Sequence, residues 1–254
     1  MIFQVTEPLL PQLRDFCKKT PFGCKIEGLW RAYGLDLPFA RFWVQQAANG
    51  SITAAISCLD GAAVLDWLST ADGEELVAFL AALGCSTLLC EEQASKALYG
   101  RADRIGVMMR RTALYDTKEE AADISSVCPI ENLREMFQLL CACGEMQEEQ
   151  FEAFYLDASH RIRHQASVAV GISKENQLLA CAMAGSMTEG MAVLSAVAVH
   201  PAWRRQGLGR TLLQGLLSSL IPRQVFVLCE SEQATLFYTS LSFSVCGAWS
   251  ELDF

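Results

Sequence analysis

The chain has 254 residues, enough for two domains of ordinary size or for one large domain. Apolar residues make up 52% of it and aromatic residues 9%, a composition that excludes a disordered chain and is sufficient to fill packed cores. Lys and Arg number 20 against 29 Asp and Glu, and the resulting formal net charge of −9 argues against a nucleic-acid-binding protein.

Hydrophobic periodicity predicts two helices at the start of the chain, over 8–19 and 24–33. Strands are predicted next over 40–45, 51–58 and 62–68, and Asp60-Gly61 between the last two is a hairpin turn signal. The first half then continues with a helix over 73–83, a strand over 87–90, a helix over 93–99 and a strand over 105–109. This is the order of an α/β domain.

The polar stretch Asp116–Asp123 is the predicted linker, so we expect one domain at residues 1–116 and a second at residues 123–254. The predicted elements of the second half are a strand over 124–127, helices over 130–141 and 151–162, strands over 167–172, 178–184 and 191–199, a helix over 208–220, a strand over 225–229, a helix over 232–241 and a strand over 243–249. The first half repeats part of this order, which indicates a degenerate internal duplication.

The eleven cysteines have no CxxC spacing, and most of them lie in apolar runs. This usage predicts buried, reduced thiols rather than a disulfide framework or a metal site. The first ten residues lack the positive region of a signal peptide. The most apolar window, 76–90, is shorter than the ~20 residues that cross a membrane. We therefore expect a cytoplasmic protein with no bound metal and no membrane partner.

A basic, glycine-containing loop at residues 204–210, called here the Arg/Gly loop, follows the strand that ends at Val199 and opens the helix over 208–220. Glycines allow backbone N–H groups to converge on an anion, and a helix N-terminus and arginines add positive charge. The loop therefore predicts a diphosphate site. Two common diphosphate motifs do not fit this loop. A dinucleotide fingerprint would need a third glycine where Leu212 stands, and a P-loop would need Gly-Lys-Ser/Thr where the sequence has Gly209-Arg210-Thr211.

Residues 199–209, VHPAWRRQGLG, resemble the acetyl-CoA-binding signature of the GNAT-superfamily N-acetyltransferases. Residues 234–243, ATLFYTSLSF, resemble the second signature of that family. Two positions depart from it, because Ser242 stands where glycine is usual and Ser231 where an asparagine often contacts the cofactor. The resemblance covers about residues 123–254. It implies two tandem GNAT-like α/β units, each a mixed, mostly antiparallel central sheet flanked by helices, the N-terminal one degenerate.

The resemblance also implies a set of site residues. Backbone groups of Val197, Ala198 and Val199 would pair with the pantetheine arm, and the Arg/Gly loop would take the pyrophosphate. The full set of implied cofactor-binding residues is Val197, Ala198, Val199, Arg204, Arg205, Gln206, Gly207, Leu208, Gly209, Arg210, Thr211 and Ser231. Tyr238 is the implied general acid, since a phenol is protonated at neutral pH and can donate to a departing thiolate.

The general base stays open. The strand over 191–199 contains no acid, although many members of the family place a glutamate there. Glu189, Glu230 or a weakly basic acceptor would each answer the need for a neutral amine, and we assign none.

The activity implied is acetyl-CoA-dependent transfer of an acetyl group to a primary amine of a small molecule, amino acid or peptide by direct attack. The alternatives are a non-catalytic CoA-binding sensor or regulatory module, and transfer of a longer acyl chain. A homodimer is compatible with this picture. In the first half, the stretch over 69–75 contains three acids where the second half has the Arg/Gly loop, so we expect that half to have lost cofactor binding.

Overall fold

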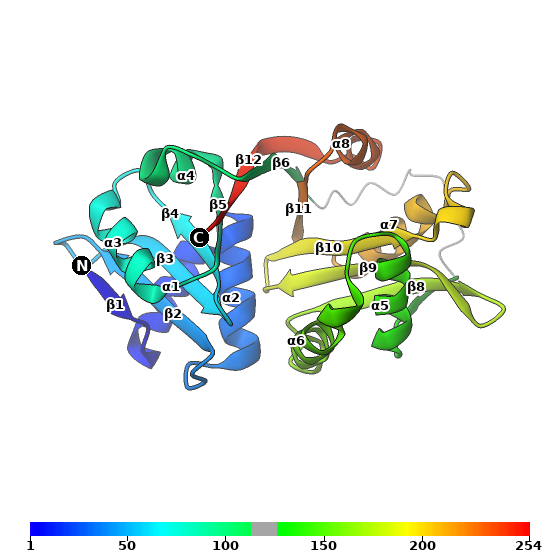
Figure 1. Ribbon diagram of the computed structural model, residues 1–254, viewed down its shortest axis with the longest axis horizontal. Coiled ribbons are helices and arrows are strands. Elements are labelled where there is room, and N and C mark those ends of the chain that lie inside the picture. Colours follow the sequence, from blue (N-terminus) through cyan, green and yellow to red (C-terminus); the bar gives the residue numbers. More distant parts are fainter. Residues whose placement is uncertain (113–125) are drawn as a thin grey trace. The chain divides into compact units, whose positions relative to one another are not determined.

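The computed structural model describes residues 1–112 and 126–254 (Figure 1). The chain packs into two compact units. The first unit combines Met1–Arg110 with Leu228–Phe254, and the second unit is Arg111–Val227. Each unit is described by itself. The predicted linker, Asp116–Asp123, and the first two residues of the strand predicted over 124–127 lie outside the described residues.

The elements of the first unit alternate as the sequence predicts. Its strands are β1 (Ile2–Gln4), β2 (Ala40–Gln46), β3 (Ile52–Leu59), β4 (Ala62–Trp67), β5 (Thr87–Glu91), β6 (Arg104–Arg111) and β12 (Ser244–Asp253). Its helices are α1 (Leu10–Cys17), α2 (Pro21–Tyr33), α3 (Gly73–Leu83), α4 (Glu92–Tyr99) and α8 (Glu232–Thr239), and a 3-10 turn, Glu7–Leu9, precedes α1.

The sheet of the first unit has the order β1-β2-β3-β4-β5-β12-β6 and is antiparallel except for the β4–β5 pair. Side chains alternate between its two faces, so each face has its own core. Phe42 and Val44 pack with α1 and α2, whereas Trp43 packs with α3 and α4. Helices therefore cover both faces of the sheet.

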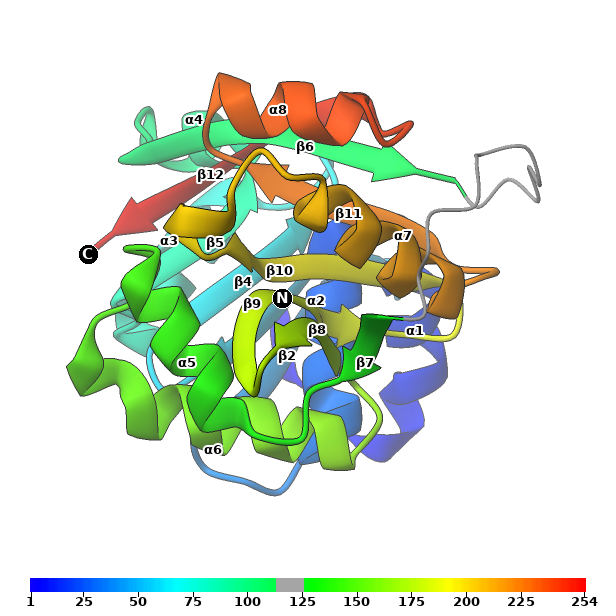
Figure 2. The same ribbon diagram turned by 90° about the vertical axis from the view of Figure 1, so that its right-hand side faces the viewer.

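The second unit repeats this plan. Its elements are β7 (Val127–Pro129), α5 (Leu133–Ala142), α6 (Phe151–Arg163), β8 (Val168–Lys174), β9 (Gln177–Met187), β10 (Met191–Val199), α7 (Leu208–Ser219) and β11 (Gln224–Cys229), with 3-10 turns at Glu148–Gln150 and Pro201–Trp203. The sheet order is β11-β10-β9-β8-β7. Helices α5 and α6 lie on one face of it and α7 on the other (Figure 2).

The two units share a detail of strand pairing. In each, one parallel pair forms and then stops: β4 pairs with β5 from Ala62 to Val64, and β10 pairs with β11 from Met191 to Leu194. All four strands run beyond their paired residues. The parallel pair is formed by the fourth and fifth strands of each unit in chain order, which supports the internal duplication inferred from element order.

Two features differ from the sequence-based expectation. A short strand, β1, precedes the first predicted helix and pairs with β2, which completes the repeat of element order. The last strand, β12, pairs with β5 and β6, so the end of the chain packs with the N-terminal half rather than only with residues 123–227. In the described parts of the chain, no helix has the length and apolar character that a membrane crossing requires.

Candidate functional site

Strand β10 of the second unit lies between β11 and β9, and halfway along its length it loses its pairing with β11 while it keeps its pairing with β9. Its register with β11 ends at the pair Leu194–Val227, and β10 continues to Val199. A bulge follows at once: Ser195 pairs with Met183 of β9 and Ala198 with Cys181, so β10 has one residue more than β9 over this interval, and Ala196 takes a φ of +51°. Bulges of this kind end pairing and turn a strand aside. The backbone of residues 195–199 therefore has no register with β11 in the described structure.

The Arg/Gly loop begins one turn beyond this strand. His200 ends the strand structurally, since its Nδ1 accepts a hydrogen bond from the backbone N–H of Ala202 at 3.3 Å. Arg205 and Gly207 both have left-handed backbones, with φ of +64° and +85°. Alternating conformations of this kind turn successive N–H groups toward one side.

The amides of the Arg/Gly loop remain available. Within the described residues, the backbone N–H groups of Arg205 to Gly209 donate no hydrogen bond, whereas those of Arg210 and Thr211 both donate to the carbonyl of Gly207. A side chain added at Gly207 would meet nothing within 4 Å. Free amides at the start of a twelve-residue helix fit the binding of a phosphate group.

The charge around the Arg/Gly loop is positive although the chain is acidic. Between Glu189 and Glu230 the sequence contains no Asp or Glu, and three arginines, Arg204, Arg205 and Arg210, stand on the loop itself. Arg204 is partly committed, because its Nε donates to the backbone carbonyl of Val199 at 3.1 Å. On the preceding hairpin, the ammonium of Lys174 lies 5.2 Å from the ring centroid of Trp203. This segment would attract an anion of several charges.

The second unit holds most of the implied cofactor residues on one continuous segment, from Val197 to Thr211. The exposed ones are Arg204, Arg205, Gln206, Gly207 and Arg210; the half-buried ones are Val197, Val199, Leu208, Gly209 and Thr211; Ala198 is buried. The sequence predicted this grouping because the residues are consecutive.

Ser231 and Tyr238 belong to the first unit, on α8. Ser231 begins that helix, and its hydroxyl accepts a hydrogen bond from the N–H of Ala234 at 3.2 Å. Tyr238 is 6% exposed and packs against Phe237 and Phe243. Burial, with a smaller contribution from Cys229, raises the pKa of its phenol, so the group stays protonated over the neutral range.

The structure explains why glycine is usual where Ser242 stands. Ser242 has a φ of +64°, and the turn it forms lets the N–H of Phe243 donate to the carbonyl of Tyr238 at 3.1 Å. Glycine takes this left-handed conformation without strain, and serine can take it at a small cost.

The position of Glu189 bears on the question of the base. Glu189 is exposed in the turn before β10, at the end of that strand opposite the Arg/Gly loop. A strand advances about 3.3 Å per residue, so Glu189 lies roughly 20 Å from Ser195, where pairing with β11 has just ended. Glu189 is therefore not placed to take a proton there. Glu230 is exposed in the first unit.

In the first unit, side chains of the unit itself occupy two places: the point where β4 and β5 stop pairing, which corresponds to the end of the β10–β11 pairing, and the start of α3, which corresponds to the start of α7. Phe22, at the start of α2, is 2% exposed and packs against Val64 of β4 and Leu89 of β5, the last paired residues of those strands. At the start of α3, the N–H of Asp72 donates to the side chain of Gln45, and the N–H of Glu75 donates to the carboxylate of Asp72.

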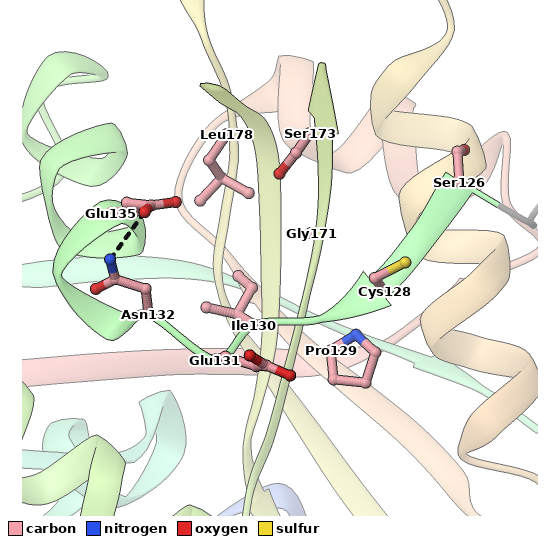
Figure 3. A pocket seen from close by; sticks show the side chains of 10 residues that line it. All are labelled: Ser126, Cys128, Pro129, Ile130, Glu131, Asn132, Glu135, Gly171, Ser173 and Leu178. Carbon is pink, nitrogen blue, oxygen red and sulfur yellow. Dashed lines mark hydrogen bonds between the residues drawn. The ribbon is translucent and has the colours of Figure 1, made fainter. Parts of the chain in front are cut away.

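A cavity of about 460 Å³ lies at the other edge of the second unit, beside β7 and the start of α5 (Figure 3). Its lining includes Glu131 and Glu135, and the amide of Asn132 donates to Glu135 Oε1 at 2.8 Å. None of the implied cofactor residues lines it. Among the described residues, no group of three or more His, Cys, Asp or Glu side chains is arranged to hold a metal ion.

Comparison with known proteins gives a family and a fold. Residues 133–243 match the family model described as the acetyltransferase (GNAT) family. A GCN5-related N-acetyltransferase from Sphaerobacter thermophilus is 15% identical, with a TM-score of 0.61 over 99% of this chain and 94% of that one. A tandem GNAT protein from the clavulanic acid biosynthesis pathway is 14% identical, with a TM-score of 0.62 over 99% and 97%. A GNAT-family acetyltransferase from Colwellia psychrerythraea is 15% identical, with a TM-score of 0.56 over 100% and 99%.

A comparison with curated protein sequences finds no match. The GNAT resemblance of the C-terminal half is confirmed by the family model. The expected fold class, a mixed and mostly antiparallel sheet flanked by helices in two tandem units, is confirmed by the structure and by its tandem neighbour. At these sequence identities, the solved structures establish the fold alone.

Proposed function

We propose that the GNAT acetyltransferase domain at residues 133–243 is an active N-acetyltransferase that uses acetyl-CoA and acetylates a primary amine of a small molecule, amino acid or peptide. The observation that carries the proposal is the run of five amides, Arg205–Gly209, that donate no hydrogen bond within the described residues, on a loop with three arginines in an acid-free segment. Each charge-assisted hydrogen bond to a phosphate contributes about 1.5–3 kcal/mol, so several would hold a diphosphate firmly.

The proposed reaction needs no covalent enzyme intermediate. The neutral amine attacks the thioester carbonyl, a C–N bond forms as the C–S bond breaks, the nitrogen loses one proton and the departing CoA thiolate gains one. Backbone groups of residues 197–199, which have no register with β11, would pair with the pantetheine arm. Holding amine and thioester together supplies about 7–11 kcal/mol toward the barrier. Tyr238 is the proposed proton donor to the thiolate, and its raised pKa favours the protonated form.

A second candidate function is a CoA-binding sensor that does not turn over. The absence of any acid on β10 favours it, because a lysine-like amine with a pKa of about 10.4 must lose a proton before attack. We propose the cytoplasm as the compartment.

Thiol release separates the two functions. The full chain is mixed with acetyl-CoA and a panel containing a dipeptide with a free amino terminus, an amino sugar and a polyamine, and free CoA is measured with a thiol reagent. Release that depends on one of the amines supports the enzyme. Calorimetric binding of acetyl-CoA with no amine-dependent release supports the sensor, and no binding at all contradicts both functions.

A further inference from the structure

Ser195 is the one polar side chain of β10, whose other residues are Met, Ala, Val and Leu. It is also the first residue after the last β10–β11 pair, Leu194–Val227. Its side chain is half-buried, and within the described residues its hydroxyl has no hydrogen-bond partner. A hydroxyl that faces no protein partner at the point where two strands part is available to a ligand.

Two bulges, one in each strand, flank this serine. Val193 pairs with Ser186 and Leu194 with Ala184, so Gly185 is the extra residue of β9. The second bulge, between Ser195 and Ala198, is in β10. Paired bulges re-aim a side chain, and they occur next to active sites more often than elsewhere.

Gly185 leaves the space that the hydroxyl uses. A Cβ built on Gly185 would stand 2.4 Å from Ser195 Oγ and 3.3 Å from Ser195 Cβ, so any side chain at residue 185 would displace the hydroxyl. A glycine inside a strand usually marks such a close approach.

The Ser195 hydroxyl lies on the face of the sheet that α5 and α6 cover. Ser195 is directly opposite Met183, and residues directly opposite each other in a sheet share a face. Met183 packs in the cluster of Leu133, Leu140 and Ala158 from α5 and α6. Ser195 therefore presents its hydroxyl beside the backbone proposed for the pantetheine arm, on this one face.

We propose that Ser195 Oγ accepts a hydrogen bond from an N–H of the acceptor amine and so orients its lone pair toward the thioester, with Gly185 keeping the hydroxyl in place. This rests on the proposed acetyl transfer and adds an acceptor-contacting residue to it. No proton passes to Ser195, because the hydroxyl only accepts the bond. The role is orientation of the nucleophile.

The test is a double-mutant cycle on the full chain. Ser195→Ala lowers kcat/KM for the amine about tenfold, the size of one lost hydrogen bond in a transition state, and leaves the Kd for acetyl-CoA unchanged. Ser195→Thr keeps a hydroxyl and stays within about threefold of the wild type. Gly185→Ala lowers kcat/KM as far as Ser195→Ala does. The double variant loses no more than Ser195→Ala alone, because both changes remove one interaction.

Ser167→Ala is the matched control. Ser167 is 3% exposed, and its hydroxyl donates to the backbone carbonyl of Ala184 at 2.7 Å, so this change lowers the melting temperature and leaves kcat/KM in place. Full activity of Ser195→Ala, or additive losses in the cycle, overturns the inference while the proposed function stands. A wild-type chain that releases thiol with no amine of the panel overturns both.

Discussion

At the scale of single residues, Asp66 is a carboxyl group buried away from water. Its carboxylate, on β4 of the first unit, is 4% exposed, and one oxygen lies 2.7 Å from where a Cβ of Gly23 would stand. Burial raises its pKa to about 7, and Glu91 adds to the rise. Hydrogen bonds from the Thr20 hydroxyl and the Trp67 N–H, and the charge of Lys19, oppose it without cancelling it.

This carboxyl predicts a pH-dependent stability. The unfolded chain loses the Asp66 proton near pH 3.8 and the folded chain only near pH 7, so stability falls as the pH rises between these values and stays reduced above them. About three pKa units correspond to on the order of 4 kcal/mol. Asp66→Asn therefore raises the melting temperature at pH 8 and changes it far less at pH 4.

Thermal unfolding at pH 4, 6 and 8 measures this effect. Asp60→Asn is the control, since it makes the same chemical change at an exposed turn residue. A wild-type and an Asp66→Asn chain whose melting temperatures differ equally at all three pH values would contradict a raised pKa of Asp66 in the folded protein.

At the scale of elements, the sequence predicted most of the fold. The bounds of α3 and β10 coincide with the predicted ranges, because strong apolar periodicity and clear end signals agree there. β1 was missed because three residues carry too little pattern to distinguish a strand from a loop. The resemblance implies a bulge in the strand over 191–199, but the positions of the two bulges around Ser195 were beyond prediction, since they are properties of the pairing between two strands.

At this scale, the prediction concerns the backbone at the start of α7 and its effect on acetyl-CoA binding. Gly207→Ala adds no clash, because nothing lies within 4 Å, but it forces alanine to a φ of +85°. The strain is about 1 kcal/mol. The backbone relieves it by changing its φ, and this change turns the loop amides away from their common direction. We expect acetyl-CoA to bind about tenfold more weakly, measured by calorimetry.

Gly190→Ala is the matched control for this change. Gly190 also has nothing within 4 Å and has no left-handed backbone, so alanine is tolerated there. Equal affinities of the Gly207→Ala and wild-type chains would contradict a role of the loop backbone in binding.

At the scale of the whole molecule, the two units share the same order of strands and helices. They differ in the side chains at the end of the parallel strand pair and at the start of the helix that follows the fourth strand. Phe22 packs against the last paired residues of β4 and β5, and Gln45 and Asp72 already accept bonds from amides at the start of α3. On the Arg/Gly loop of the second unit, by contrast, five backbone amides donate no hydrogen bond within the described residues.

The chain is therefore expected to bind one acetyl-CoA. Isothermal titration of the full chain should give a stoichiometry near one, and Arg205→Glu should abolish the signal rather than halve it, because a carboxylate on the loop repels the phosphates. A stoichiometry of two, or a residual site in the Arg205→Glu chain, would mean that the first unit has kept a cofactor site.

The sequence by itself determined the element types, the internal repeat, the family resemblance and the continuous segment from Val197 to Thr211, because each depends on residues close together in the chain. Only the tertiary structure decided that β12 pairs with β5 and β6, that Phe22 packs where β4 and β5 stop pairing, and that Gly185 makes room for Ser195. These contacts join residues that are distant in sequence or depend on strand register, and a local pattern of residues does not encode register.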